Sequence, residues 1–111
     1  MTEMYKVCVS IPPEFADKLM DSVTKVADPV YPGYERAFSV TRITGTWRTL
    51  EGSSPYNGKI GDVTEADELK IEFAVKEKDL KATVSEIVRI HPYEEPGIDI
   101  IPMIGWKSIL E

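Results

Sequence analysis

The order of secondary structure is set by a change of hydrophobic period within residues 5–28, YKVCVSIPPEFADKLMDSVTKVAD. In residues 5–11 apolar and polar side chains alternate, which is the pattern of a strand with one buried face. The apolar residues that follow repeat every three or four positions, as they do in an amphipathic helix. Pro13 suits the first turn of that helix, and Asp28-Pro29 ends it. The stretch therefore predicts a strand followed by a helix that covers one face of a sheet.

The same two periods return along the rest of the chain. Residues 36–44 are β-branched and alternating, and they predict a second strand that bends or bulges at Gly45. The later elements are predicted as a strand at 68–77, a helix at 79–91 and a short strand at 97–103. Asp79 is the expected N-cap of the second helix. Its apolar side is expected to hold Leu80, Val84, Ile87, Val88 and His91.

The resulting order βαββαβ predicts a single α+β domain over residues 1–111, a length that suits one domain. Two crossovers joined by a hairpin give the ferredoxin-like fold, a four-stranded antiparallel sheet with two helices on one face. A long connection, residues 45–66, lies between the second and third strands, and residues 104–111 form a tail. Because no helix covers the second face of the sheet, we expect the chain to self-associate there.

Composition excludes some partners. The net charge is −6 with dispersed basic residues, so the patch that draws proteins to nucleic acid is absent. No apolar run approaches the about 18 residues of a membrane span, and the first residues lack the features of a signal peptide. We expect a cytoplasmic protein. The one cysteine, Cys8, lies in an apolar run and is expected to be a buried small side chain rather than a reactive thiol.

The predicted topology brings three segments to one end of the sheet. They are the end of the first strand (residues 10–12), the 45–66 connection and residues 91–96, HPYEEP. Connections of this length inside a small domain are usually functional or carry structure of their own. We therefore expect any site to form where these segments meet.

The only histidine in the chain, His91, allows three interpretations. With Glu94 and Glu95 it has the ligand types for zinc or copper, but a metal site needs about three or four fixed ligands, so a neighbouring subunit would have to complete it. As a general base it would need an orienting carboxylate and a substrate pocket. In the structural interpretation it lies on the last helical turn, where the dipole favours a cation, while Tyr93 packs and the glutamates are solvated.

The connection at 45–66 is rich in glycine and hydroxyl groups but lacks the spacing of a phosphate-binding loop. Lys59 and nearby backbone NH groups could hold an anion there. Pro55 and Asn57-Gly58 are expected turn residues. Trp47 and Tyr56 either pin the loop to the domain or to a neighbouring subunit, or stack on a ligand.

Two segments carry a family resemblance: GTWRTLEGSSPYNGKIGDVTEADELKIEF (residues 45–73) and HPYEEPGIDIIPM (residues 91–103). Over about residues 4–104 the chain resembles the YqfO-type domain, a PII/CutA-like module of longer Nif-three-like (NGG-one-interacting-factor) proteins. The HPYE-x-P element also resembles CutA, the divalent-cation tolerance family. The resemblance implies a PII-like fold that associates through its sheets, commonly as trimers, with effector clefts between subunits. The two-metal site of the Nif-three core needs several histidines and is not implied for this chain.

Together these observations predict a non-enzymatic homo-oligomer, a trimer or alternatively a dimer, that binds a small effector or a divalent metal between subunits, or regulates a partner there. The site would set His91, Tyr93, Glu94 and Glu95 against Trp47, Tyr56 and Lys59. Two alternatives stay open. One is metal-assisted hydrolysis with His91 as ligand or base, and the other is a protein-interaction lid for a separate Nif-three-like core.

Overall fold

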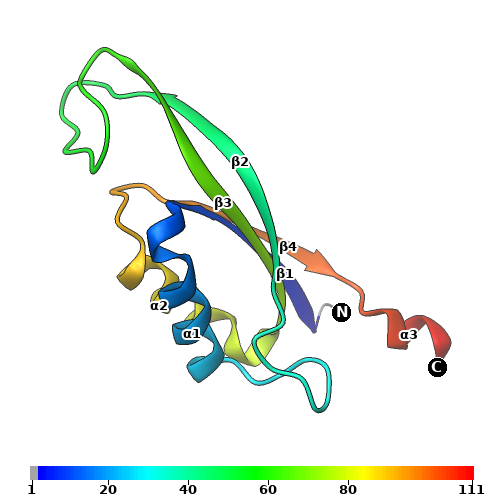
Figure 1. Cartoon of the computed structure of the whole chain (residues 1–111). Helices are drawn as coiled ribbons and strands as arrows, with labels where there is room; N and C mark the ends of the chain where they lie inside the picture. Colours follow the sequence, from blue (N-terminus) through cyan, green and yellow to red (C-terminus); the bar gives the residue numbers. More distant parts are fainter. Residues whose placement is uncertain (1–2) are drawn as a thin grey trace.

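The computed structural model describes residues 3–111, so residues 1 and 2 of the predicted domain lie outside the described residues. Its elements are β1 (Met4–Ile11), η1 (Pro13–Phe15), α1 (Ala16–Val26), β2 (Ser39–Arg48), β3 (Val63–Lys76), α2 (Glu77–Ile90), β4 (Gly97–Met103) and α3 (Trp106–Leu110). The four long strands form one antiparallel sheet in the order β2-β3-β1-β4. Both long helices lie on the same side of this sheet (Figure 1). The predicted ferredoxin-like fold is confirmed.

The core lies between the sheet and the two helices. Alternate residues of β1 and β3 face α1 and α2, as the period of two requires. Its most buried members are Val7, Val9, Ile11, Leu19, Ile71, Val75 and Ile87. The helix predicted from residues 12–28 begins as the 3-10 turn η1, with Pro13 in its first turn, and continues as α1.

The second helix differs from its prediction at both its start and its buried face. It begins at Glu77 with Lys76 as N-cap, and the carboxylate of Asp79 instead accepts a hydrogen bond from the backbone NH of Asp28 at 3.0 Å. The fully buried positions are Thr83, Ile87 and Ile90, whereas Val88 is exposed. The predicted helical period is correct, but the buried face of the helix is rotated away from Val88 and toward Thr83 and Ile90.

The connection predicted at 45–66 is much shorter in the structure. β2 runs through Gly45 to Arg48, and β3 begins at Val63, so the irregular segment is residues 49–62. Four further residue pairs extend the hairpin ladder, from Gly45 opposite Ala66 to Arg48 opposite Val63. β-branched and aromatic residues keep these positions extended in spite of the surrounding glycines. The two strands project beyond the ends of β1 and β4 (Figure 1).

Gly45 is required by a side chain and not by a bend in the strand. A Cβ atom at this position would lie 2.3 Å from Oε1 and 2.7 Å from Cδ of Glu68. The glutamate side chain lies across the glycine, on the face of the sheet away from the helices, as the alternation along β3 requires. The expected bulge at Gly45 is therefore wrong, and the glycine marks a close approach.

The face of the sheet away from the helices has no covering layer among the described residues (Figure 1). Cys8 lies on this face and is nevertheless buried, and burial raises the pKa of its thiol, as expected for a small apolar residue. The molecule is elongated, 53 × 25 × 24 Å, with α3 projecting from one end. Within residues 3–111 no helix is long and apolar enough to cross a bilayer.

We predict that Gly45→Ala lowers the free energy of unfolding by about 1–3 kcal/mol, because the new methyl group must displace the buried Glu68 carboxylate. Gly97→Ala is the matched control, since a Cβ there meets nothing within 4 Å. Urea denaturation of both variants measures the difference. In a Glu68→Ala background the cost of Gly45→Ala should largely disappear. Additive effects of the two substitutions would contradict the proposed steric cause.

Candidate functional site

The three segments expected to converge do meet at one end of the sheet. The loop of residues 49–62 curls back toward the 91–96 segment between α2 and β4 (Figure 1). The backbone NH of Ser54 donates to the carboxylate of Glu94 at 3.2 and 3.4 Å, which links the two loops directly. Phe15 of η1 packs edge-on against Tyr56 at a centroid distance of 6.0 Å and ties the first loop to the domain. The fold therefore makes neighbours of segments that lie far apart in the sequence.

A cleft of about 410 Å³ lies between the two loops. Its walls come from Ser10 at the end of β1, from β2 and the following loop, from Glu68 on β3, and from the Tyr93–Glu95 segment. Volumes of 300–1,000 Å³ are typical of small-molecule sites. The cleft is therefore large enough for a metabolite.

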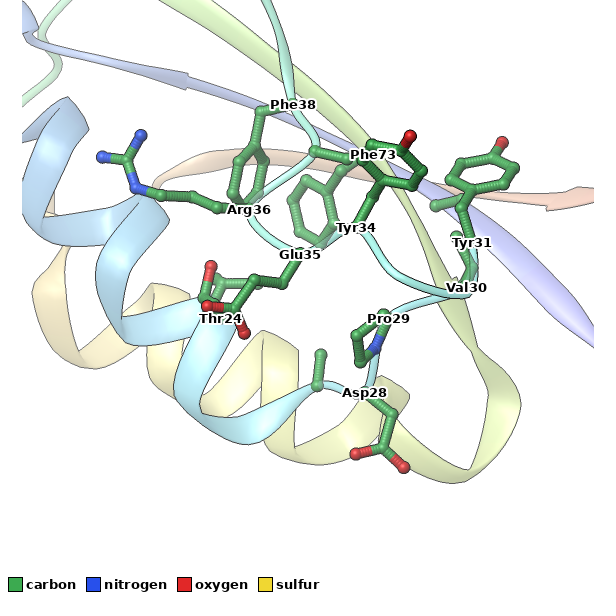
Figure 2. Close-up of a pocket in the computed structure, with 14 residues that line it drawn as sticks. Thr24, Asp28, Pro29, Val30, Tyr31, Tyr34, Glu35, Arg36, Phe38 and Phe73 are labelled. Carbon is green, nitrogen blue, oxygen red and sulfur yellow. The ribbon is translucent and has the colours of Figure 1, made fainter.

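A second cavity lies at the other end of the helix layer. Figure 2 shows it between the end of α1, residues 28–38 and Phe73 of β3. Its volume is about 40 Å³, which holds about three water molecules. Phe38 and Phe73 pack edge to face there at 5.0 Å. This cavity is a packing gap under a loop, so the larger cleft is the candidate site.

Three aromatic side chains border the cleft, and Tyr93 lies in the middle of them. The ring centroid of Tyr93 is 5.5 Å from that of Trp47 and 6.0 Å from that of Tyr56. The ring planes are tilted by 57° and 46°, so the rings form inclined walls and not a flat stack. Tyr56 is half exposed, which leaves ring surface open on the cleft side.

Glu68 lies beside these rings and is the most buried carboxylate of the described chain, with 5% of its surface exposed. Its Oε2 accepts a hydrogen bond of 2.5 Å from the hydroxyl of Tyr93. Burial, together with this contact, raises the pKa of Tyr93, so the phenol stays protonated and remains the donor. No second hydrogen bond to the carboxylate occurs within residues 3–111. A carboxylate can accept about four, so Glu68 can take further hydrogen bonds from water or from a ligand.

His91 links the backbone of Tyr93 to the end of β1. It is the C-cap of α2, it is buried, and its Nε2 donates to the backbone carbonyl of Ser10 at 2.6 Å. Its Nδ1 accepts from the backbone NH of Tyr93 at 3.2 Å, which fixes the Nε2-protonated tautomer. Burial lowers the pKa of the imidazole, against the smaller opposing effects of Ser10 and Glu68. The expected cation on the last helical turn is therefore wrong, because the ring is a neutral bridge between two segments.

Five of the predicted site residues line the cleft: Trp47, Tyr56, Tyr93, Glu94 and Glu95. His91 lies beneath Tyr93, with the two rings 4.9 Å apart, and is not part of the lining. Lys59 is exposed and lies outside it, and its carbonyl closes a turn with Asp62. Glu94 and Glu95 are both exposed, as expected, and the carboxylate of Glu94 also accepts a hydrogen bond from the backbone NH of Ser54.

The residues proposed for a metal do not fit one within a single chain. Both ring nitrogens of His91 are engaged in the hydrogen bonds that hold the fold. Within residues 3–111 no three side chains of histidine, cysteine, aspartate or glutamate converge in a way that suits a metal ion. Zinc or copper binding by His91, Glu94 and Glu95 stays a prediction, and it would require the histidine to give up these bonds and a neighbour to supply further ligands.

Sequence reasoning missed Glu68 as a member of the site. Glu68 is the first residue of the strand predicted at 68–77, and nothing in that alternating pattern marks its side chain as buried. The available signal was Gly45, because a glycine opposite a strand position often marks a close approach of another group. Thr49 was also missed. It is buried against the loop, and its hydroxyl has no hydrogen-bond partner among the described residues.

We predict that part of the stability is lost as the pH falls below about 6.5. The folded-state pKa of His91 is depressed, so the unfolded chain binds the proton first and the stabilisation is complete only above the unfolded pKa, near 6.5. Urea denaturation between pH 7 and pH 5 should show a slope approaching about 1.4 kcal/mol per pH unit from this group. His91→Gln should be less stable and lack that component. Parallel pH profiles for the two proteins would contradict the role given to His91.

No family model matches the chain. It is, however, 33% identical over 99 residues to a "GTP cyclohydrolase 1 type 2 homolog" of Staphylococcus epidermidis and 31% identical over 100 residues to the protein of that name from Halalkalibacterium halodurans. These matches cover 89% and 90% of this chain but 27% of each relative. The chain thus spans about a quarter of the length of the curated relatives it matches, and the name describes those longer proteins.

Solved structures give the same result for the fold. A Bacillus cereus protein related to NIF3 superposes with a TM-score of 0.80 at 24% identity, covering 94% of this chain and 26% of that one. CutA1 from Shewanella sp. SIB1 superposes with a TM-score of 0.71 at 15% identity, covering 98% of this chain and 90% of that one. Bacillus subtilis GlnK does so at 0.63 and 16% identity, covering 92% and 86%. The chain is therefore similar in sequence to one segment of these longer proteins, and it has the form of the ferredoxin-like fold seen in the NIF3-related structure, CutA1 and GlnK.

Proposed function

We propose that the protein is a self-associating, PII/CutA-like sensor module that binds a small ligand in the cleft between residues 49–62 and 91–96. The observation that carries the proposal is the cleft itself, about 410 Å³ in volume and walled by three aromatic rings and a buried carboxylate. Among the described residues the Glu68 carboxylate accepts one hydrogen bond and forms no salt bridge, so it can still bind a partner in the cleft. A ligand in the cleft would supply that partner.

The loops give the cleft a means of signalling. Glu94 holds the 49–62 loop through one backbone NH, and Tyr93 reaches the other wall through one hydroxyl. A ligand that contacts both walls would stabilise this closed arrangement relative to an open one, and the difference in affinity would shift the population. The β2–β3 hairpin projects from the domain (Figure 1), and most residues of its 49–62 loop are exposed and accessible to a partner protein.

Self-association is supported by the surface that the single chain exposes. A folded monomer of this mass exposes about 6,200 Å², whereas this chain exposes 7409 Å². The excess, about 1,200 Å², is larger than the about 800 Å² that one partner buries in a standard interface. The radius of gyration, 15.5 Å, likewise exceeds the about 13 Å expected for this length. The uncovered sheet face and the exposed apolar tail are the surfaces that a neighbour would cover.

The two alternatives make different demands. Hydrolysis through His91 would require the imidazole to leave both of its hydrogen bonds, so it predicts a rearranged loop in the active state. A protein-interaction lid predicts capture of a Nif-three-like core without any response to small molecules. A screen for small molecules that bind the unmodified protein distinguishes the ligand-binding proposal from both alternatives.

A thermal-shift screen of nucleotides, amino acids, amines and divalent metals tests the proposal at a fixed protein concentration. A ligand at about ten times its Kd should stabilise the protein by about 1.4 kcal/mol and raise Tm by about 5 °C. The shift should vanish in Tyr56→Leu, which removes a wall of the cleft, and persist in Tyr34→Leu, which removes an exposed tyrosine elsewhere. The proposal fails if no compound class shifts Tm, or if both variants respond alike.

Light scattering after size exclusion tests self-association. We expect a trimer at micromolar concentration, with a dimer as the other oligomer consistent with the proposal. Ile101→Lys places a charge on the uncovered face and should dissociate it, because Ile101 lies opposite Lys6 on that side of the sheet. Val88→Lys changes an equally exposed residue on the helix side and should leave the assembly intact. A monomeric unmodified protein would contradict the proposal.

A further inference from the structure

We propose that the cleft takes an organic cation, a molecule whose alkylated ammonium group lies among Trp47, Tyr56 and Tyr93 and faces the Glu68 carboxylate. This inference rests on the proposed function, that the cleft binds a small ligand, and it adds the chemical class of that ligand.

The aromatic walls give the first reason. A cation is attracted to the face of a tryptophan or tyrosine ring within about 6 Å of its centroid, and the attraction increases when water is excluded. The rings of Trp47 and Tyr56 flank Tyr93 at 5.5 and 6.0 Å, so a group in contact with Tyr93 is also near a second ring. Their tilt gives an alkylated ammonium group, which is nearly spherical, several ring faces to touch.

The second reason is the buried carboxylate. Glu68 is 5% exposed, lines the cleft, and accepts one hydrogen bond, from a tyrosine hydroxyl that carries no charge. Within residues 3–111 no lysine or arginine forms a salt bridge with it. A charged side chain buried in this way is normally paired with an opposite charge. A bound cation would supply the missing charge.

The charge of the rim gives the third reason. Glu94 and Glu95 border the cleft with Glu68, whereas Arg48 is the one basic residue among the lining positions. The chain as a whole carries −6. This field attracts cations to the opening and disfavours phosphates and carboxylates. The negative phosphates of a nucleotide would be repelled by these glutamates.

The donor set also separates an organic cation from a metal ion. A divalent metal needs several oxygen, nitrogen or sulfur ligands at fixed distances, whereas the cleft offers one buried carboxylate among ring faces. Ring faces bind a weakly hydrated alkylated ammonium group well. The volume of about 410 Å³ exceeds that of a small ammonium ion, so the cationic group is expected to belong to a larger molecule.

Choline and its neutral isostere 3,3-dimethylbutan-1-ol, which have the same shape, test the role of charge. The chain has two tryptophans, and Trp106 is exposed on α3, away from the cleft. In the Trp106→Phe variant all tryptophan fluorescence therefore comes from Trp47, in the wall of the cleft. Titration of this variant at constant ionic strength should give a saturable change of fluorescence with choline. The isostere should bind at least about tenfold more weakly.

Paired substitutions locate the charge that is responsible. Glu68→Gln in the same background should weaken choline binding about tenfold or more, whereas Glu65→Gln removes one charge from an exposed position of the same strand and should change it less than twofold. Thermal unfolding confirms that each variant is folded. If Glu68→Gln does not fold, the comparison of choline with its isostere still decides, because it uses the intact cleft.

The outcomes separate this inference from the proposed function. If choline and the isostere bind equally, or if ATP binds and choline does not, the cleft is a ligand site but the cation class is wrong. If choline binds with the same affinity in Glu68→Gln and Glu65→Gln, the attraction comes from general surface charge and the inference is overturned. If no compound of any class is bound, the proposed function fails as well.

Discussion

The hydrogen bond from Tyr93 to Glu68 joins the parts of the molecule that make a site possible. It fixes the loop after α2 to the third strand, across a sequence separation of 25 residues. Gly45 leaves the space that the Glu68 side chain occupies, and His91 sets the backbone of Tyr93 by accepting its NH. The cleft walls are thus held by a chain of contacts that runs from β1 through His91 and Tyr93 to β2.

This arrangement explains how a small domain can hold a buried carboxylate without a salt bridge. The core between sheet and helices is made of aliphatic side chains and supplies the stability. The cleft lies outside that core, beyond the end of β1, where the β2–β3 hairpin projects. In its wall Glu68 is buried with one hydrogen bond, from Tyr93, and with no salt bridge among the described residues. The same projection makes the molecule elongated, and the second face of the sheet is uncovered because both long helices lie on the other side.

Much of the fold followed from local patterns, and the differences have identifiable causes. The alternation in β1 and the 3.6 period of both helices were sufficient for the element order and topology. The extension of β2 and β3 to Arg48 and Val63 was missed because glycines suggested a loop, whereas cross-strand pairing decided the outcome. Tyr93, Trp47 and Tyr56 were found because topology brings their segments together. Glu68 was missed because its burial depends on Gly45 and Tyr93, which no local pattern of β3 reveals.

The most direct test of the account is to map the binding surface by NMR. Titrating tetramethylammonium chloride into uniformly ¹⁵N-labelled protein, with sodium chloride as the reference, should shift the amide signals of Gly45, Ser54, Glu68 and Tyr93 in a saturable way. These four come from both walls of the cleft and from the strand between them. Shifts confined to the α1 end of the molecule, or scattered in proportion to surface charge, would contradict the assignment of the cleft as the binding site.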